Sequence, residues 1–438
     1  MLEVKLDLNN FNLITDERMD IMKTSTKPVR GTRDFGPRDM ELRDYVQQTI
    51  IEIYREAGFS RIQTPVLEDI DNLLGSDGGE NLKLIFKILK RGDKLQLDKE
   101  GLNEVELSDM GLRYDLTLPL SRFYADNQGT LPATFKSIQV GEVFRAERPQ
   151  KGRFRSFVQC DIDIIGEEDC NAEMELILTT AKALNKLDFK NFVVRINDRR
   201  VLKSTIEYAG FPSEEVGKVC IILDKLDKIG LEGVKKELLS CEYNGAWVEK
   251  FLEILEALEN DGLDKLKEFG VEEKVVDDLK SVLEVVASQA NGTYEIKFDP
   301  SLVRGMGYYT GMIFEIEYSD FGCSVAGGGR YDKMIGRFMK KDVPAVGFSI
   351  GFERILTILE EKEFKIPNRN EKIAFLYEKG NDNMVEVFKE ADKIRGVGKS
   401  VCIIPKQKKV GKQIDKLQEL GFDAFCIYNA EGFEIKSI

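Results

Sequence analysis

The sequence predicts an α+β protein that carries a helical insertion and ends in a small α/β domain. Strand-like segments alternate with turns over residues 105–165 and end in a charged hairpin. Residues from about 199 to 290 are instead mainly helical by pattern, and Val216–Ala287 carry many Leu, Glu and Lys at helical spacing, which predicts a separate group of helices. Residues 373–428 alternate regularly between strand and helix patterns. That alternation is typical of a small α/β domain with a largely parallel sheet.

The N-terminal part of the chain is predicted to contain one long helix. Residues 1–27 have the composition of a polar extension, and Pro28–Pro37 is a loop punctuated by Gly and Pro. An amphipathic helix is expected near Met40–Ala57, because its apolar residues recur at helical spacing. The following segment, Arg61–Leu67, is predicted to be a strand at an edge or interface, since Pro65 cannot donate to a sheet ladder.

The charged hairpin is the most informative local feature. Strand-like residues Ser137–Val140 and Phe157–Ile164 flank a cation-rich loop that contains one Pro and one Gly. Its arms are expected to project Arg145, Glu147 and Gln159 toward one face. Arginine suits planar, bidentate contact with phosphate. For a basic loop taken alone, the alternative is a charged surface hairpin with no ligand.

The remaining elements follow from the same rules. Residues 171–188 are predicted to be helical, and strands return between Tyr294 and Tyr318. Ala326-Gly-Gly-Gly-Arg-Tyr-Asp332 is expected to be a flexible turn before another helix, and Ala345–Leu356 to be a strand leading into a helix. In the tail we expect strands at Ile373–Tyr377, Ser400–Ile404 and Ala424–Tyr428, separated by helices at Met384–Arg395 and Lys409–Leu420.

Composition limits the functional classes. A chain of 438 residues should hold two or three domains, and its net charge of −13 argues against a protein that coats nucleic acid indiscriminately. No apolar run is long enough to span a membrane, and the first residues do not resemble a signal peptide. The seven cysteines are scattered and include no C-x-x-C. We therefore expect a reduced, cytoplasmic protein without a structural zinc site.

The chain contains no histidine. Histidine general bases and histidine metal sites are thereby excluded. Its chemistry must use carboxylates, arginines, lysines, hydroxyls or a metal carried by the substrate.

Four separated segments carry a family resemblance. They are Gly111–Leu120, the hairpin Phe144–Gln159, Leu302–Gly311 and Ala345–Arg354. In order and spacing these segments resemble the motifs of histidyl-tRNA synthetases, a branch of the class II aminoacyl-tRNA synthetases. The third segment, with its R-G-x-x-Y-Y pattern, is the most discriminating. The resemblance covers most of residues 28–438 and implies an antiparallel sheet flanked by helices.

The resemblance implies a reaction that depends on positioned cations. The carboxylate of histidine would attack the α-phosphate of ATP, so catalysis should come from positioning and from charges placed on the phosphates. Catalytic roles are implied for Arg145, Arg304 and Arg354, and a Mg²⁺ contact for Glu147. The ATP-binding residues implied are Arg145, Glu147, Arg153, Phe157 and Arg354. An isolated arginine is more often part of a surface ion pair, and it is the match across several motifs that favours the catalytic interpretation.

The amino-acid pocket needs acceptors for an ammonium group and for an imidazole N–H. By resemblance, the histidine-binding residues are Asp115, Leu116, Thr117, Arg145, Gln159, Asp163, Arg304, Tyr308 and Tyr309. Core or interface packing is the alternative for the two tyrosines. The chain departs from the family at Gly307, where relatives often carry Asp, and this removes a carboxylate near the tyrosine pair.

The resemblance also implies a domain division and partners. The catalytic domain would comprise residues 28–198 and 291–367, with a helical insertion at 199–290 and a short anticodon-binding-like domain at 368–438. The expected partners are the acceptor end of tRNA(His), its anticodon and a second copy of the chain, since the helix and Pro-containing strand resemble a motif at the dimer interface. Tail lysines from Lys406 to Lys416 would form either a phosphate-contacting edge or a solvated helix face.

A second function remains open at this stage. The regulatory subunit of ATP phosphoribosyltransferase resembles the synthetase core but has no synthetase activity. That family commonly lacks the anticodon-binding domain and loses catalytic motif residues. The retained arginines and the α/β tail favour the enzyme.

Overall fold

The computed structural model describes residues 25–75, 80–97, 102–148, 153–303, 307–318 and 321–438. Its main feature is a sheet with the strand order β1-β5-β6-β11-β10-β9-β7-β8, in which only β1/β5 and β7/β8 pair in parallel. The predicted antiparallel-rich sheet flanked by helices is confirmed. The strands are β1 (Ser60–Arg61), β5 (Phe135–Phe144), β6 (Ser156–Ile165), β7 (Phe192–Asp198), β8 (Tyr294–Phe298), β9 (Met312–Tyr318), β10 (Cys323–Arg330) and β11 (Ala345–Gly351).

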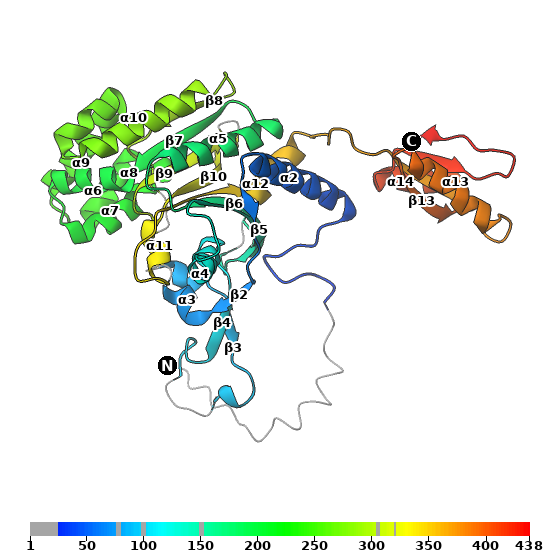
Figure 1. The fold of residues 1–438 in the computed structure, drawn as a ribbon, viewed down its shortest axis with the longest axis horizontal. Coiled ribbons are helices and arrows are strands. Elements are labelled where there is room, and N and C mark those ends of the chain that lie inside the picture. Colours follow the sequence, from blue (N-terminus) through cyan, green and yellow to red (C-terminus); the bar gives the residue numbers. More distant parts are fainter. Residues whose placement is uncertain (1–24, 76–79, 98–101, 149–152, 304–306, 319–320) are drawn as a thin grey trace.

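One face of this sheet is apolar and carries the core. Side chains alternate along a strand, so Ile138, Ile162 and Phe348 point to the same face and are fully buried. Three helices cover that face (Figure 1): α2 (Pro37–Glu56), α5 (Asn171–Lys186) and α12 (Phe352–Glu361). The opposite face carries polar residues and glycines, and it holds the candidate site.

The first predicted strand, Arg61–Leu67, is wrong as a single element. Ser60–Arg61 is an edge strand of the main sheet, whereas Leu67 begins β2 in a separate sheet with the order β2-β4-β3. Pro65 separates the two because it has no N–H to offer a ladder. This second region contains β2 (Leu67–Asp69), α3 (Ile70–Gly75), η2 (Glu80–Leu84), β3 (Lys87–Leu89), η3 (Gly92–Lys94), β4 (Ser108–Leu112) and α4 (Thr117–Asn127).

The glycine-rich segment is a central strand and not the turn we predicted. Residues 326–330 belong to β10, which pairs with both β9 and β11. A Cβ on Gly328 would collide with the carbonyl oxygen of Gly347 and lie 2.8 Å from Cα of Phe348. Glycine is needed here because two backbones approach closely, so it does not mark a turn. The helix that follows, α11 (Asp332–Gly336), is short.

A group of helices lies between β7 and β8 in the chain. They gather at one end of the molecule (green in Figure 1), and α10 packs against β8. Their own apolar residues, such as Phe251, Leu238 and Leu279, are fully buried. The elements are α6 (Arg199–Ala209), η4 (Ser213–Glu215), α7 (Val216–Leu223), α8 (Leu226–Ser240), α9 (Gly245–Asp261), η5 (Gly262–Phe269) and α10 (Glu273–Ser288).

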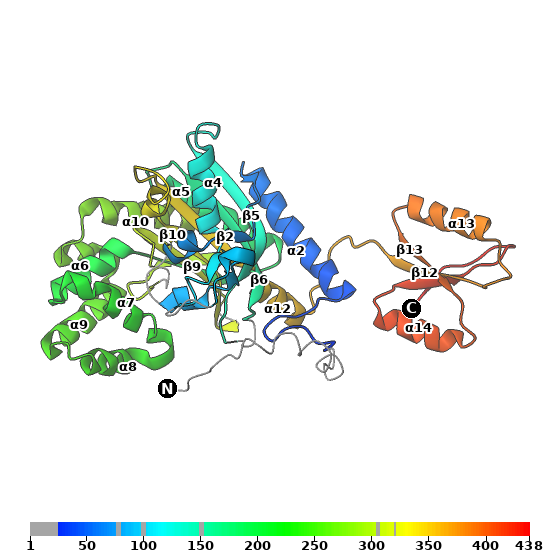
Figure 2. The ribbon, with the colours of Figure 1, turned by 90° about the horizontal axis from the view of Figure 1, so that it is seen from below.

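The tail forms a small α/β unit, as predicted. Its sheet has the order β13-β12-β14-β15, with β12 parallel to both β13 and β14. Figures 1 and 2 show this unit set apart from the main sheet and joined to it by an extended linker. Its elements are β12 (Lys372–Tyr377), α13 (Met384–Gly396), β13 (Ser400–Pro405), α14 (Val410–Glu419), β14 (Ala424–Ile427) and β15 (Lys436–Ser437). In the part of the chain that is described, no helix is long and apolar enough to cross a membrane.

Candidate active site

The candidate site is built on the polar face of the main sheet. Gln159, Asp161 and Asp163 occupy alternate positions of β6, so all three side chains point to this face. On the neighbouring strand β11, Ser349 lies opposite Asp161 and Gly347 opposite Asp163. A Cβ on Gly347 would collide with Oδ1 of Asp163. The register therefore gives the carboxylate of Asp163 the space that a larger neighbour would fill.

A pocket of about 120 Å³ opens above these strands. It brings together seven of the nine residues predicted to bind histidine. The eighth, Leu116, is buried, and its carbonyl oxygen accepts a hydrogen bond from Nε2 of Gln139 at 2.9 Å. The ninth, Arg304, lies outside the described residues. The pocket is lined by Asp115, Thr117, Arg145, Gln159, Asp161, Asp163, Tyr308, Tyr309, Gly327, Tyr331, Gly347, Phe348 and Ser349.

Asp163 lines the pocket with one carboxylate oxygen hydrogen-bonded and the other buried without a partner. The hydroxyl of Tyr331 donates to Oδ1 at 2.7 Å, whereas Oδ2 is buried without a hydrogen-bond partner. Burial raises the pKa of Asp163 to about 7, against the hydrogen bond from Tyr331, and the charge of Asp115 adds to the rise. A buried acceptor without a partner costs free energy, so the pocket favours a ligand that donates an N–H at this point.

The two predicted tyrosines form an aromatic wall with a third. The rings of Tyr308 and Tyr309 lie 4.9 Å apart at 63°, and the ring of Tyr331 lies 6.1 Å from that of Tyr308. Burial raises the pKa of Tyr308 well above its usual value, so its hydroxyl stays protonated. A Cβ on Gly329 would lie 2.9 Å from the ring of Tyr309, so this glycine leaves room for the wall.

Arg145 brings a cation to one end of the pocket. Its Nε donates to the carbonyl oxygen of Tyr114 at 3.2 Å. The guanidinium carbon lies 4.4 Å from the ring centroid of Tyr114 and 5.1 Å from that of Phe157. These contacts orient the planar group, which suits bidentate contact with a carboxylate or phosphate.

The other predicted ATP-binding residues lie outside this pocket, at the end of the sheet where β5 finishes and β6 begins. This end of the strands is called the sheet edge below. Arg354 sits in the first turn of α12, and because Gly351 pairs with Gln159, this turn lies at the same edge as Phe157. Its Nη1 donates to the carbonyl oxygen of Ser324. Beyond β5, Glu147 and Arg153 form a partly exposed ion pair at 3.7 Å. The edge therefore presents arginines and one aromatic ring beside the pocket.

A buried ion pair fixes the start of α12. Both guanidinium Nη atoms of Arg43 donate to the carboxylate of Glu353, at 2.7 and 2.8 Å. The backbone N–H of Val158 also donates to Glu353, at 3.4 Å. This arrangement ties α2, α12 and β6 together next to Arg354.

Sequence reasoning missed six residues that line the pocket, and three of them have polar side chains. Asp161 has the same strand parity as Gln159 and Asp163, and that alternation was sufficient to identify it. Tyr331 belongs to the glycine-rich segment, whose assignment as a turn concealed the side chain. Ser349 accepts a hydrogen bond from Nε2 of Gln159 at 2.9 Å, and no local pattern marks it.

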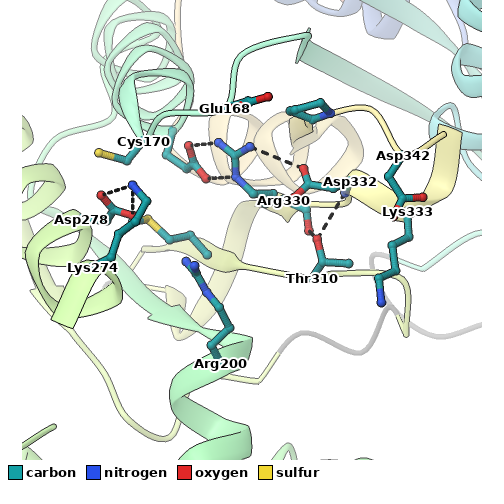
Figure 3. Close-up of a pocket in the computed structure, with 13 residues that line it drawn as sticks. Glu168, Cys170, Arg200, Lys274, Asp278, Thr310, Arg330, Asp332, Lys333 and Asp342 are labelled. Carbon is teal, nitrogen blue, oxygen red and sulfur yellow. Dashed lines mark hydrogen bonds and ion pairs between the residues drawn. The ribbon is translucent and has the colours of Figure 1, made fainter. Parts of the chain in front are cut away.

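Two larger pockets lie elsewhere. One, of about 440 Å³, lies between α10, α5 and the end of β10, and is lined mainly by charged side chains (Figure 3). There Arg330 bonds to both oxygens of Glu173. The other, of about 780 Å³, lies between the inserted helices and the sheet. Among the described residues, no group of three or more Cys, Asp or Glu could hold a metal ion.

Comparisons with known proteins agree with this geometry. A family profile described as "Histidyl-tRNA synthetase" matches residues 31–355. A histidine–tRNA ligase of Leifsonia xyli subsp. xyli is 39% identical over 422 residues, which cover 94% of this chain and 97% of the relative.

Solved structures show the same fold. The histidyl-tRNA synthetase of Nostoc sp. PCC 7120 superposes with a TM-score of 0.77 at 25% identity, over 95% of each chain. A protein of Bacillus halodurans described as an ATP phosphoribosyltransferase regulatory subunit/histidyl-tRNA synthetase gives a TM-score of 0.73 at 20% identity, over 93% of this chain and 100% of that one. Fold alone therefore does not separate the two functions, but the relative from Leifsonia xyli, at 39% identity, is named as a ligase.

Proposed function

The chain belongs to the histidyl-tRNA synthetase family, and from this premise we propose that it joins histidine to its tRNA in two steps. First, the histidine carboxylate attacks the α-phosphate of ATP, giving histidyl-adenylate and pyrophosphate. Second, a hydroxyl at the 3′ end of the tRNA attacks the activated carbonyl, and AMP leaves. The observation that carries this proposal is the buried, unpaired Oδ2 of Asp163, a residue that lines a pocket walled by tyrosines.

Histidine would bind with its imidazole between Asp163 and Tyr308. Oδ2 of Asp163 accepts a hydrogen bond from the N–H of one ring nitrogen, and the hydroxyl of Tyr308 forms a hydrogen bond with the other nitrogen. Asp115, Thr117 and Gln159 then face the α-ammonium group from the opposite end of the pocket. A side chain without ring N–H groups would leave these buried polar atoms unpaired, at a cost of about 1–3 kcal/mol each. This is the physical basis of selection for histidine.

ATP would bind along the sheet edge beside this pocket. The family uses ATP, and here Arg145 would hold the histidine carboxylate against the α-phosphate. By resemblance to the family, Arg304 would supply a second cation to that phosphate. Phe157 and Arg354 would hold the adenine ring between them, and Arg153 would contact the γ-phosphate. The protein contributes position and charge, because the attacking carboxylate and the leaving pyrophosphate do the covalent chemistry themselves.

Mg²⁺ would arrive with the nucleotide. Glu147 is a single carboxylate in a partly exposed ion pair, which fits a cation that keeps most of its ligands as water and substrate phosphates. When bound, Mg²⁺ would supply positive charge to the phosphates. Glu147 would hold the ion in position, and the ion pair with Arg153 would orient the carboxylate of Glu147.

The proposal also covers the domains of the chain, its oligomeric state and its location. Residues 28–198 and 291–367 form the catalytic domain, 199–290 an insertion, and 368–438 a domain that contacts the anticodon. The enzyme acts as a homodimer in the cytoplasm. The regulatory-subunit alternative is not favoured, since the arginines of the motifs are present and the relatives are named as ligases.

The direct test is histidine-dependent exchange between ATP and pyrophosphate with the full chain. We expect exchange with L-histidine and none with other amino acids, followed by aminoacylation of tRNA(His). Arg145→Ala should lower the exchange rate by two orders of magnitude or more, as for removal of a transition-state contact. Absence of exchange at saturating histidine and ATP would overturn the assignment.

A further inference from the structure

One carboxylate of the pocket has no role in the binding scheme above. Eight buried side-chain atoms in the described part of the chain lack a hydrogen-bond partner, and three of them lie on one strand, β6. They are Oε1 of Gln159, Oδ1 of Asp161 and Oδ2 of Asp163, and all three residues line the same pocket. Such groups are normally paired, so three unpaired acceptors on one strand of the pocket indicate a ligand with several donors.

The spacing of these acceptors matches a ligand with donors at both ends. Alternate residues of a strand lie about 7 Å apart, so Asp161 is one such step from Asp163 and one step from Gln159. If Asp163 receives the imidazole, Asp161 and Gln159 lie toward the α-amino end. An ammonium group carries three N–H donors and needs several acceptors.

A purely structural role does not account for Asp161. Ser349, its neighbour on β11, lies within hydrogen-bonding reach of Asp161, but its hydroxyl also accepts from Gln159. Asn would fill the same space with less free-energy cost, because burying an ionised carboxylate is expensive unless a cation meets it. Arg145 and Arg113 act on Asp161 through their charge, and a ligand cation in direct contact would offset the remaining cost.

We propose that Asp161 binds the α-ammonium group of histidine and makes the pocket selective for ligands with a free cationic amino group. This inference rests on the proposed function and adds one specificity-determining residue to it. Asp161 would accept a charge-assisted hydrogen bond through Oδ1, between the contacts made by Gln159 and Asp163.

The charges around Asp161 support this assignment. Asp163 on the same strand and Asp115 before α4 face it with the same sign, while Arg145 and Arg113 are the cations beside it. Burial raises the pKa of Asp161 well above its usual range, and the charge of Asp163 raises it further, whereas Ser349 and Arg145 act in the opposite direction. An arriving ammonium would stabilise the ionised form, so binding should release a proton.

The test compares two ligands on two variants by isothermal titration calorimetry with the full chain. The ligands are L-histidine and imidazolepropionate, which lacks the amino group. Asp161→Asn removes the charge in nearly the same volume. Asp109→Asn is the matched control, because Oδ1 of Asp109 is also buried without a partner but lies on β4, outside this pocket.

We expect Asp161→Asn to weaken L-histidine binding by roughly 10- to 100-fold, the range for a hydrogen bond between charged groups, while imidazolepropionate binds as before. Proton release on histidine binding, read from titrations in two buffers of different ionisation enthalpy, should fall in the same variant. Asp109→Asn should change none of these values.

Unchanged histidine affinity in Asp161→Asn, or an equal loss for both ligands, would overturn the inference. If Asp161→Asn does not fold, Asp161→Ser carries the same comparison with a smaller polar side chain. The proposed function fails separately, if the unsubstituted protein neither binds L-histidine nor catalyses exchange.

Discussion

The hydroxyl of Tyr331 donates to Oδ1 of Asp163 at 2.7 Å, and this bond joins the end of the glycine-rich strand to the centre of the pocket. Both side chains are buried. The bond leaves Oδ2 of Asp163 buried and without a hydrogen-bond partner, in a residue that lines the pocket. In the proposed binding scheme, this one carboxylate should therefore affect both the affinity for histidine and the stability of the protein without ligand.

Histidine binding should weaken as pH falls below neutral. The pKa of Asp163 is raised to about 7 by burial, so below pH 7 the carboxyl increasingly carries a proton and loses its acceptor at Oδ2. We expect the KM for histidine to rise by up to about tenfold per pH unit below 7. The protein itself contains no histidine that could produce such a titration.

The ligand also titrates near this pH, so the comparison needs Asp163→Asn. In that variant the protein contribution should disappear, leaving only the titration of free histidine. Parallel pH profiles of KM in the two proteins would contradict the role of Asp163.

The same residue should lower stability at high pH. Its pKa rises from 3.8 in the unfolded chain to about 7 in the folded one, so the folded state binds more protons between these values. The penalty is absent below pH 3.8, grows between pH 3.8 and 7, and reaches about 4 kcal/mol above pH 7, at ~1.4 kcal/mol per pKa unit. Asp163→Asn should therefore unfold at a higher temperature than the parent at pH 8, with a smaller difference at pH 5.

Thermal unfolding followed by circular dichroism at both pH values tests this. Saturating L-histidine should reduce the difference at pH 8, since it binds the parent more tightly. An Asp163→Asn variant that is less stable than the parent at pH 8 would contradict the prediction.

The space beside Asp163 should affect histidine binding and stability as much as the charge of Asp163 does. In Gly347→Ala the new Cβ would collide with Oδ1 of Asp163 and lie 3.1 Å from Cε1 of Tyr331. Overpacking of this kind costs about 1–3 kcal/mol, and the displaced carboxylate should raise the KM for histidine more than it lowers kcat. Gly411→Ala is the control, because a Cβ there meets nothing within 4 Å. Equal kinetics in Gly347→Ala and the parent would show that the collision is relieved elsewhere.

Helices and strands that are defined by a local pattern could be predicted from the sequence. The tail strands and helices lie within two residues of their predicted bounds at each end, because alternation and helical periodicity are local signals. The hairpin of β5 and β6 was predicted for the same reason. The polar positions of β6 follow from strand parity, which identifies Asp161 once Gln159 and Asp163 are assigned.

What could not be predicted depends on contacts distant in the sequence. β6 pairs with β11, which lies about a domain's length later in the sequence. Only that pairing places Gly347 against Asp163. The glycines of β10 were taken for a turn because their need for close backbone contact is set by β9 and β11. Local rules treat Gly as flexible, whereas here neighbouring strands fix its conformation.

A buried ion pair behind the pocket should support the position of Tyr331. Arg330 donates to both carboxylate oxygens of Glu173 at 2.8 and 2.7 Å (Figure 3). Its carbonyl oxygen also accepts from the backbone N–H of Thr310 at 2.8 Å, which links it to the tyrosine segment. Glu173→Gln would leave the buried guanidinium without its counter-charge, so we expect a loss of about 3–5 kcal/mol in the free energy of unfolding.

Urea unfolding and the KM for histidine measure this effect. The same pocket offers a control in the partly exposed pair of Lys274 and Asp278, whose nearest charged atoms lie 3.4 Å apart. Asp278→Asn should cost less than ~1 kcal/mol, because exposed ion pairs contribute little. Similar losses in Glu173→Gln and Asp278→Asn would show that burial does not strengthen the first pair.

The C-terminal unit should serve tRNA recognition and not adenylate formation. It has its own core, including Phe375 and Cys426, and it is set apart from the main sheet (Figure 2). Arg369 connects it to the rest, since it pairs with Glu41 on α2 and with Asp423. A chain ending at Pro367 should fold and keep the rate of ATP–pyrophosphate exchange within about threefold of the parent. Removal of a catalytic contact would lower that rate far more, and the truncation removes none of the proposed catalytic residues.

Aminoacylation should respond differently to the same truncation. Removal of the tail takes away exposed lysines such as Lys408, Lys409 and Lys412, which can neutralise tRNA phosphates. We expect the KM for tRNA to rise at least tenfold and the salt dependence of aminoacylation to weaken, while the KM for histidine stays unchanged. The substitution of these three lysines by Ala in the full chain separates charge from fold: it should weaken the salt dependence with no change in exchange. If truncation reduced exchange as strongly as aminoacylation, the tail would instead be part of the catalytic fold.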